Sequence, residues 1–157
     1  MTFDATPSHT ASPPLALAAC DELSVCDLNG VERFLVWSLR WASALHDDAG
    51  FAEMCLQDSF DRASLGAVLP VFRRYVATVH GAPTPCPPSA RLGCWRINRI
   101  EAHTLHALAS LQADRFGEAW HALAAVCTRL EAARAMLALG EIADALTAMG
   151  ARVRPWR

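Results

Sequence analysis

The spacing of apolar residues predicts a long helix early in the chain. Between residues 31 and 46, apolar side chains recur every three or four positions, which is the period of an α-helix with one buried face. Asn29 and Glu32 have the spacing of a capping box, in which each side chain accepts a hydrogen bond from the other's backbone N–H. We therefore expect the helix to begin near Gly30. Further apolar residues widen the stripe, which predicts a central helix with neighbours on two sides.

Two more amphipathic stretches follow, and each predicts a helix. The first covers residues 51–60, where Phe51, Met54 and Cys55 are expected to point inward, with Phe60 as a further inward candidate. The second covers residues 61–80 and contains Pro70, which lacks a backbone N–H and clashes with the preceding helical turn. We expect this helix either to kink at Pro70 or to begin there, with the proline in its first turn.

A proline-rich connection leads into the second half of the chain. Residues 81–97 contain four prolines and two glycines, so we expect a long loop without regular structure. Asn98 and Glu101 repeat the capping spacing, and the helix that they begin is expected to run to about Gln112. Long loops inside compact domains often carry function, which directs the search for chemistry to this segment.

The next segment predicts two closely packed helices. Asp114 has the side chain of a good N-cap and is expected to begin the second of them. The sequence ALASLQADRFGEAWHAL at residues 107–123 resembles the turn of a tetratricopeptide hairpin, with Phe116 and Ala119 at the aromatic and small positions. The resemblance covers about one hairpin, and no second copy follows at that period. It implies a helical hairpin and no peptide-binding groove.

A third capping box marks the last helix. Thr128 and Glu131 have the required spacing, so we expect a helix over residues 129–149, either interrupted or only weakened at Gly140, that ends at Gly150. Together with the earlier patterns, this predicts an all-α fold, a single-domain helical bundle of four to six helices.

Composition divides the chain into three parts. Residues 1–26 are rich in Thr, Ser, Pro and Ala and bury little surface, so we expect a disordered N-terminal tail. Residues 27–150 form the predicted helical domain, and 53% of the whole chain is hydrophobic, enough for a core. Residues 151–157 form a short basic C-terminal tail.

Charge and hydrophobicity limit the function classes. Fourteen basic residues, all arginine, face sixteen acidic residues, and the net charge of −2 gives no global attraction to nucleic acid or anionic lipid. The early apolar run at residues 15–19 is too short to span a bilayer. The six cysteines lack the regular spacing of a disulfide framework. We expect a cytoplasmic protein with reduced thiols.

One set of residues suggests a metal site. His80, Cys86 and Cys94, together with His103 or His106, are side chains of the types that hold zinc with four ligands. Structural zinc sites usually place paired ligands about two to four residues apart. Seven residues separate the two cysteines, so the spacing favours a packed loop with no cofactor over a zinc site.

Two smaller features of the same region also suggest chemistry. Cys94 lies among arginines, which favour the thiolate and make it a candidate reactive thiol. His103 and His106 are three residues apart and share one helix face, as metal ligands or a proton relay would.

A basic and aromatic cluster suggests binding instead of catalysis. Its members suit an acidic protein partner or nucleic acid, and they are Arg91, Trp95, Arg96 and Arg99. A second set of arginines lies in the C-terminal tail. No helix-turn-helix with a basic recognition helix is recognised, so nucleic acid is the weaker choice.

The function predicted from these patterns is a non-enzymatic helical interaction or regulatory protein with a protein partner. Neither a Gly-x-Ser-x-Gly, nor a glycine-rich phosphate loop, nor a Cys-x-x-Cys occurs in the sequence. The alternative is a metal-binding or thiol-dependent protein with a Cys/His site in residues 80–106. A weak nucleic-acid binder is the third hypothesis.

Overall fold

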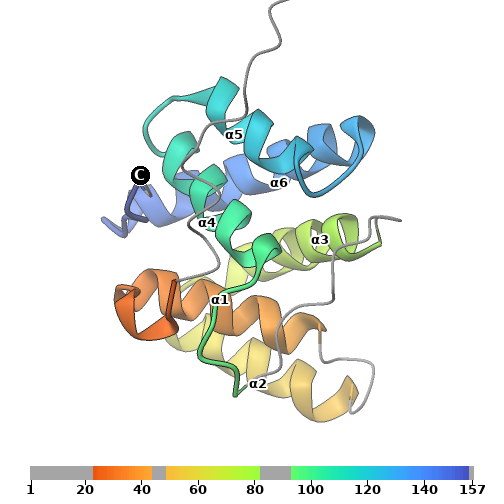
Figure 1. Cartoon of the computed structure of the whole chain (residues 1–157). Helices are drawn as coiled ribbons and strands as arrows, with labels where there is room; N and C mark the ends of the chain where they lie inside the picture. The colour runs from red at the N-terminus through yellow and green to blue at the C-terminus, as the bar shows by residue number, and fades with distance from the viewer. Residues whose placement is uncertain (1–22, 44–48, 82–92, 156–157) are drawn as a thin grey trace, which may run out of the picture.

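The fold is all-α, as the sequence predicts. The structure, a computed structural model, describes residues 23–43, 49–81 and 93–155. Six α-helices are present in these ranges (Figure 1). They are α1 (Gly30–Ser43), α2 (Ala49–Arg62), α3 (Leu69–His80), α4 (Arg99–Leu111), α5 (Phe116–Ala124) and α6 (Arg129–Ala148), with short 3-10 turns η2 (Val25–Asp27) and η4 (Gly66–Val68).

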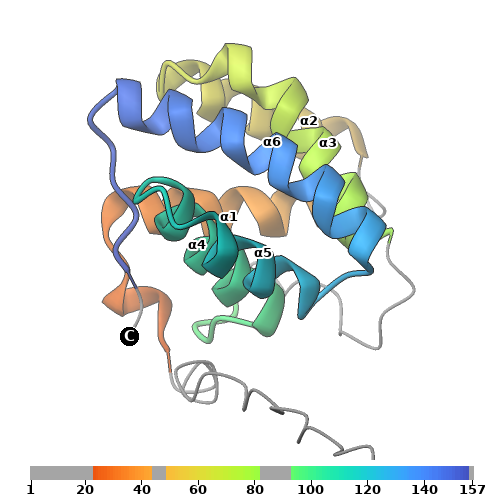
Figure 2. The ribbon, with the colours of Figure 1, turned by 90° about the horizontal axis from the view of Figure 1, so that it is seen from above.

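The helices pack around one continuous core. Helix α1 contacts α2, α3 and α4, which confirms a central helix with neighbours on more than one side. Helix α4 packs most extensively against α5 and also contacts α6. Figure 2 shows α6 crossing the molecule between α3 and α5. Helix α4 therefore connects the α1 end of the bundle to the α5 and α6 end.

All three predicted capping boxes are present. Asn98 Oδ1 accepts from the backbone N–H of Glu101 at 2.8 Å, and the Glu101 carboxylate accepts from the Asn98 N–H at 3.0 Å. Asn29 and Glu32 make the same pair of bonds at 2.9 and 2.8 Å. Thr128 and Glu131 complete the third box at the start of α6. Each box satisfies backbone donors that the first helical turn leaves without partners.

Proline and glycine set two other helix boundaries. Helix α3 begins at Leu69 with Pro70 in its first turn, so the second of the two alternatives for this proline is correct. The residues before it form the separate turn η4. Gly150 follows α6 with a φ of +72°, a left-handed conformation that side chains disfavour, and it ends the helix as predicted.

The predicted inward face of α2 is right at Phe60 and wrong at the start of the helix. Phe51 and Met54 are exposed and Cys55 is half-buried, and the helix buries Ala52 and Leu56 in line with Phe60, at four-residue spacing. The reason is the ring of Phe60, whose centroid lies 5.1 Å from those of both Phe34 and Phe72. Those ring contacts fix the rotation of α2, and the rotation turns its first apolar residues outward.

The predicted hairpin of α4 and α5 is confirmed, but two details of it are wrong. Asp114 does not cap α5; it has a φ of +56° in the connecting turn, and Arg115 takes the N-cap position without a side-chain cap. Ala119 is fully buried between the helices, whereas Phe116 is exposed. Close packing at the small residue is therefore sufficient for the hairpin.

Parts of the predicted tails fall within the described ranges. Residues 1–22 and 156–157 lie outside them. Residues 24 and 96 form an isolated antiparallel bridge. Val153 is buried, and its backbone N–H donates to Gln112 Oε1 at 2.9 Å. The segment after α6 thus packs on the helical domain. Among the described helices, none combines the length and the apolar character that crossing a membrane requires.

Candidate partner-binding surface

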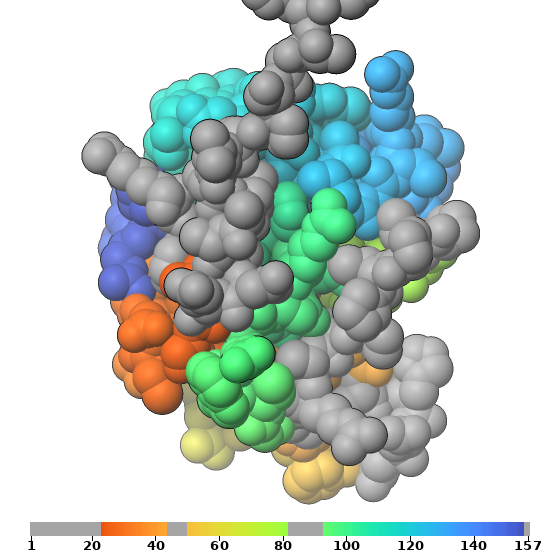
Figure 3. Space-filling view, viewed as in Figure 1, coloured from red at the N-terminus to blue at the C-terminus, as the bar shows by residue number. Residues whose placement is uncertain are grey.

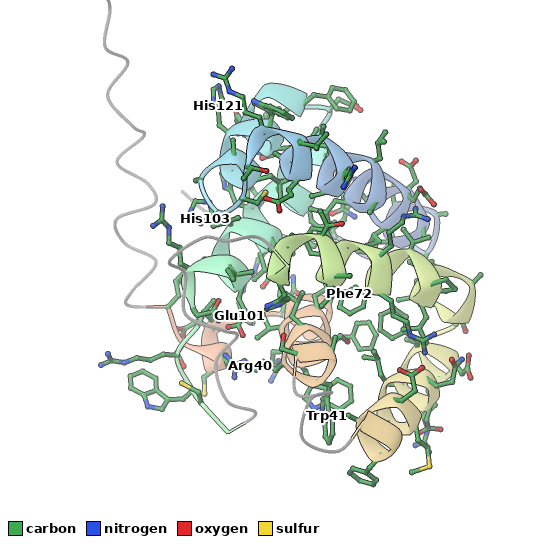
Figure 4. All side chains as sticks on the ribbon, turned by 90° about the vertical axis from the view of Figure 1, so that its right-hand side faces the viewer. Arg40, Trp41, Phe72, Glu101, His103 and His121 are labelled. Atoms are coloured by element: carbon green, nitrogen blue, oxygen red, sulfur yellow. The ribbon has the colours of Figure 1, made fainter. Side chains whose placement is uncertain are left out.

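A buried ion pair lies beneath the region that the sequence selects for chemistry. Arg40 of α1 and Glu101 of α4 are both inaccessible to solvent or nearly so. Arg40 Nε donates to Glu101 Oε1 at 2.8 Å and Nη2 donates to Oε2 at 2.9 Å, and Figure 4 shows the two side chains pointing toward each other. This is the two-pronged geometry that arginine and carboxylate favour. The bond to Glu101 outweighs burial and raises the pKa of Arg40.

The same guanidinium holds the backbone before α4. Arg40 Nη2 also donates to the carbonyl oxygen of Arg96 at 2.9 Å, and Nη1 donates to that of Cys94. The other edge of this segment pairs with residues 23–25. Val25 N–H donates to Trp95 O at 2.8 Å, and Ile97 N–H donates to Leu23 O at 3.1 Å. Residues 94–97 are thus fixed from two sides.

The side chain of Trp95 projects from this fixed backbone. It is 58% exposed, and the Arg96 guanidinium carbon lies 4.7 Å from the centroid of its ring. That distance is typical of a cation–π contact. In Figure 3, the segment that begins at residue 93 is green, and its atoms lie at the surface of the molecule.

The four predicted partner-binding residues are not all brought together. Trp95 and Arg96 are in contact. Arg99 lies in the first turn of α4 and donates from Nη2 to the carbonyl oxygen of Ala125 at 3.2 Å, which directs it toward the end of α5. Arg91 lies outside the described residues. The structure therefore defines a small surface of two residues, which we call the Trp95–Arg96 surface.

The candidate zinc ligands are held by other contacts. His80 Nε2 lies 3.0 Å from Ser43 Oγ, at the ends of α3 and α1. Cys94 bonds Arg40 through its carbonyl oxygen, and Cys86 lies outside the described residues. Within the described ranges, no three His, Cys, Asp or Glu side chains are grouped as a metal ion would need. A zinc site remains a prediction.

The two candidate histidines of α4 lie in different surroundings. His103 is buried and makes a backbone hydrogen bond with Ala122 of α5, while its Nδ1 has no partner within the described residues. Burial, helped by nearby Arg99, lowers the pKa of His103 to about 4, so the ring is neutral at pH 7. His106 is half-buried, and burial lowers its pKa as well. Figure 4 shows His103 on α4 within the bundle.

The described cysteines are free thiols, as the sequence predicts. They are Cys26, Cys55, Cys94 and Cys127. Cys127 is buried, and its Sγ donates to Leu123 O at 3.1 Å; burial raises its pKa to about 11 and keeps it a thiol. Cys94 is only half-buried, and its reactivity remains a prediction.

Two arginines near the C-terminus bind the segment after α6 to the helical domain. Arg154 Nη2 donates to Glu32 Oε2 at 2.8 Å, and the Arg154 N–H donates to Glu32 Oε1 at 2.7 Å. Arg152 Nη1 donates to Gln112 O at 3.1 Å. These bonds attach the last described residues to α1 and to the end of α4, so Arg152 and Arg154 have a structural role, and Arg157 lies outside the described residues.

Sequence reasoning missed the residue that organises the surface. Arg40 lies four residues after Val36, and both are buried on the same side of α1. A charged residue on the apolar face of a predicted central helix is the signal that identifies it, because such a charge needs a buried partner.

Compared with protein-family models, curated proteins and solved structures, the chain matches none. The functional assignment therefore depends on the geometry of the molecule itself.

Proposed function

We propose that the protein is a non-enzymatic interaction protein that binds a protein partner through the Trp95–Arg96 surface. The observation that carries the proposal is an exposed tryptophan, in contact with an arginine, on a backbone held from two sides. Tryptophan and arginine are prominent among the residues that dominate binding energy at protein interfaces. An exposed indole ring on a fixed backbone also loses little conformational freedom when a partner covers it.

The chemistry of this surface favours a partner with a carboxylate beside an apolar group. The Arg96 side chain is exposed and carries a guanidinium, which binds carboxylates through two parallel hydrogen bonds. The Trp95 ring supplies a flat apolar face that would contact the neighbouring group. A short segment of another protein in which an acidic residue stands beside an apolar residue supplies both the carboxylate and the apolar group.

The test compares two aromatic residues of nearly equal exposure. Trp95 is 58% exposed and Phe116, at the start of α5, is 59% exposed. The full-length protein is used to isolate a binding partner from extracts of its own source cells, and the partner's affinity is then measured for W95A and F116A. We expect W95A to weaken binding by at least about tenfold, as removal of a dominant interface residue does. F116A should bind like the wild type.

A charge variant separates the two parts of the surface. R96E should weaken the same partner and should reduce the salt dependence of its binding, because the attractive charge is lost. Equal binding by wild type, W95A and R96E would contradict the proposal. So would equal losses for W95A and F116A.

A further inference from the structure

Two cysteines occupy matching positions beside the antiparallel bridge between residues 24 and 96. The two backbone hydrogen bonds that flank this bridge join the neighbours of residues 24 and 96, so 24 and 96 themselves are a non-hydrogen-bonded pair. Pairs of this kind recur every second position along an antiparallel ladder. Two residues forward from 24 and two residues back from 96 lead to Cys26 and Cys94. Extended by one step, the register therefore sets Cys26 opposite Cys94.

The carbonyl groups before α4 follow this register as far as Cys94. The carbonyl oxygens of Cys94 and Arg96 both accept from the Arg40 guanidinium, on one edge of the segment. The carbonyl oxygen of Trp95 accepts from the Val25 N–H, on the opposite edge. This alternation is that of an extended strand, in which every second side chain lies on the same face. Cys94 therefore holds the strand position that the register assigns to it.

Cys26 lies one residue beyond the last bonded position of its own segment. Val25 is that position and also begins the turn η2, and the Cys26 N–H donates to Ser24 Oγ at 3.1 Å. The Ser24 N–H in turn donates to Asp27 Oδ2 at 3.2 Å. These bonds fix the backbone on both sides of Cys26, directly beside the bridge. The side chain of Cys26 is exposed and that of Cys94 is half-buried, so a small reagent can reach both thiols.

We propose that Cys26 and Cys94 are a redox pair that forms a reversible disulfide, with a small-molecule disulfide such as glutathione disulfide as the oxidant. Non-hydrogen-bonded antiparallel pairs have Cα atoms about 4.5 Å apart, and disulfides join Cα atoms about 4.4–6.8 Å apart. The fold therefore brings the two thiols together before the oxidant arrives. Formation of this bond does not depend on a partner at the Trp95–Arg96 surface.

The oxidation consists of two thiol–disulfide exchanges. In the first, the Cys26 thiolate attacks one sulfur of glutathione disulfide, a mixed disulfide forms, and one glutathione thiolate leaves. In the second, the Cys94 thiolate attacks Cys26 Sγ, the bond between the two cysteines forms, and the second glutathione thiolate leaves. The released thiolates take up the two protons that the cysteines lose. The cysteine pair gives up two electrons, and glutathione disulfide accepts them.

The test maps the disulfide in the folded, full-length protein. The protein is treated with glutathione disulfide near pH 8, where an ordinary thiol is partly ionised, and the remaining thiols are blocked with iodoacetamide. Trypsin and a protease that cuts after glutamate release Cys26 within residues 23–32 and Cys94 within residues 92–96, apart from the other four cysteines. Mass spectrometry should show these two fragments joined, with two hydrogen atoms lost, and dithiothreitol should separate them.

Serine variants and an unfolded control make the assignment specific. C94S should lose the joined fragments and accumulate glutathione on Cys26, because the second exchange lacks its attacking thiol. C26S should also lose the joined fragments. C55S changes a half-buried cysteine on α2 and should form the bond as the wild type does. In concentrated urea, the wild type should give a mixture of links among its cysteines, because the bridge is absent.

Three results would overturn the proposal. The first is oxidised, folded wild type without the joined fragments, including protein that carries glutathione on both cysteines. The second is a main product in which Cys26 or Cys94 is linked to a different cysteine. The third is an equal share of the link between Cys26 and Cys94 in folded and unfolded protein, since proximity in the fold would then have no effect.

Discussion

The starts of α1 and α4 use the same sequence pattern in two different surroundings. Each begins with Asn-x-x-Glu, and in both helices the glutamate is fully buried and bound to an arginine. In α4 the partner, Arg40, is only 4% exposed, whereas in α1 the partner, Arg154, is 51% exposed. The two helices share the same local capping motif, and they differ in how far the arginine that binds the glutamate is exposed to solvent.

The difference shows how one motif takes on two tasks. The Arg40 guanidinium has donors left after binding Glu101, and these hold the carbonyl groups around Trp95. Arg154 holds the segment after α6 against α1 and also donates to the Asp27 carbonyl oxygen. One ion pair thus positions a surface, and the other attaches a chain segment. In α6 the third box is exposed and serves only its helix.

The largest expected effect comes from breaking the buried pair. R40M leaves the Glu101 carboxylate buried without a positive partner and should lower the free energy of unfolding by about 3–5 kcal/mol. Urea denaturation measures the change. R40M/E101Q keeps a capping acceptor and removes the uncompensated charge, so it should recover part of the loss. A change below about 1 kcal/mol in R40M would mean that the pair is solvated.

The free energy of unfolding should depend on pH through the buried His103 of α4. The pKa of His103 is about 4 in the folded protein, against an unfolded value near 6.5. Between these values the unfolded chain binds a proton that the folded chain excludes, so stability falls as pH decreases from 6.5 to 4, by up to about 3 kcal/mol.

The measurement is urea denaturation across that pH range. H103Q should flatten the dependence, and H121Q, which changes an exposed histidine, should leave it as in the wild type. A slope in H103Q that equals the wild-type slope would exclude His103 as its source.

A smaller loss of folding stability is expected when the ion pair at the start of α1 is removed. R154A removes an ion pair whose arginine is half exposed, so water can solvate the Glu32 carboxylate that remains. At present, burial acts to raise the pKa of Glu32, but hydrogen bonds from Arg154 and from the Asn29 backbone outweigh it and hold the pKa below its usual value. The loss in R154A should be less than about half of that in R40M. If the two variants lose equally, the difference in burial has no energetic consequence.

The smallest effect is expected at the exposed box of α6. T128A removes one cap bond and should cost about 1 kcal/mol, the usual value for an N-cap threonine. N98A should cost more, because it also disturbs the position of Glu101. Thermal denaturation of the two variants measures the order, and a larger loss in T128A would contradict it.

The sequence predicts most of the helix boundaries because they depend on local chemistry. The start of α5 is the exception, since Asp114 lies in the connecting turn and does not cap the helix. Asn98, Thr128, Pro70 and Gly150 act within one turn of their own positions. Contacts between distant residues are different. Arg40 and Glu101 are 61 residues apart in the chain, and only the packing of α1 against α4 brings them together.

The error at α2 has the same origin. The rotation of α2 depends on rings from α1 and α3, so its own apolar pattern does not determine which residues turn inward. At the candidate surface, Trp95 and Arg96 are in contact because they are adjacent in the chain, whereas Arg99 is directed toward the end of α5. The exposure of Trp95 and Arg96 depends on the backbone contacts of Arg40, which no local pattern shows.

The bond between Glu32 and Arg154 also has a consequence for protein synthesis. These residues are separated by 122 positions. A ribosome that adds about 5–20 residues per second needs roughly 6–24 s to make that intervening stretch. During that time the Glu32 carboxylate lacks its Arg154 partner, so the start of α1 cannot reach its final buried environment until Arg154 has been made. Helix α1 precedes the other described helices in the chain, yet its N-terminus is expected to reach its final environment among the last.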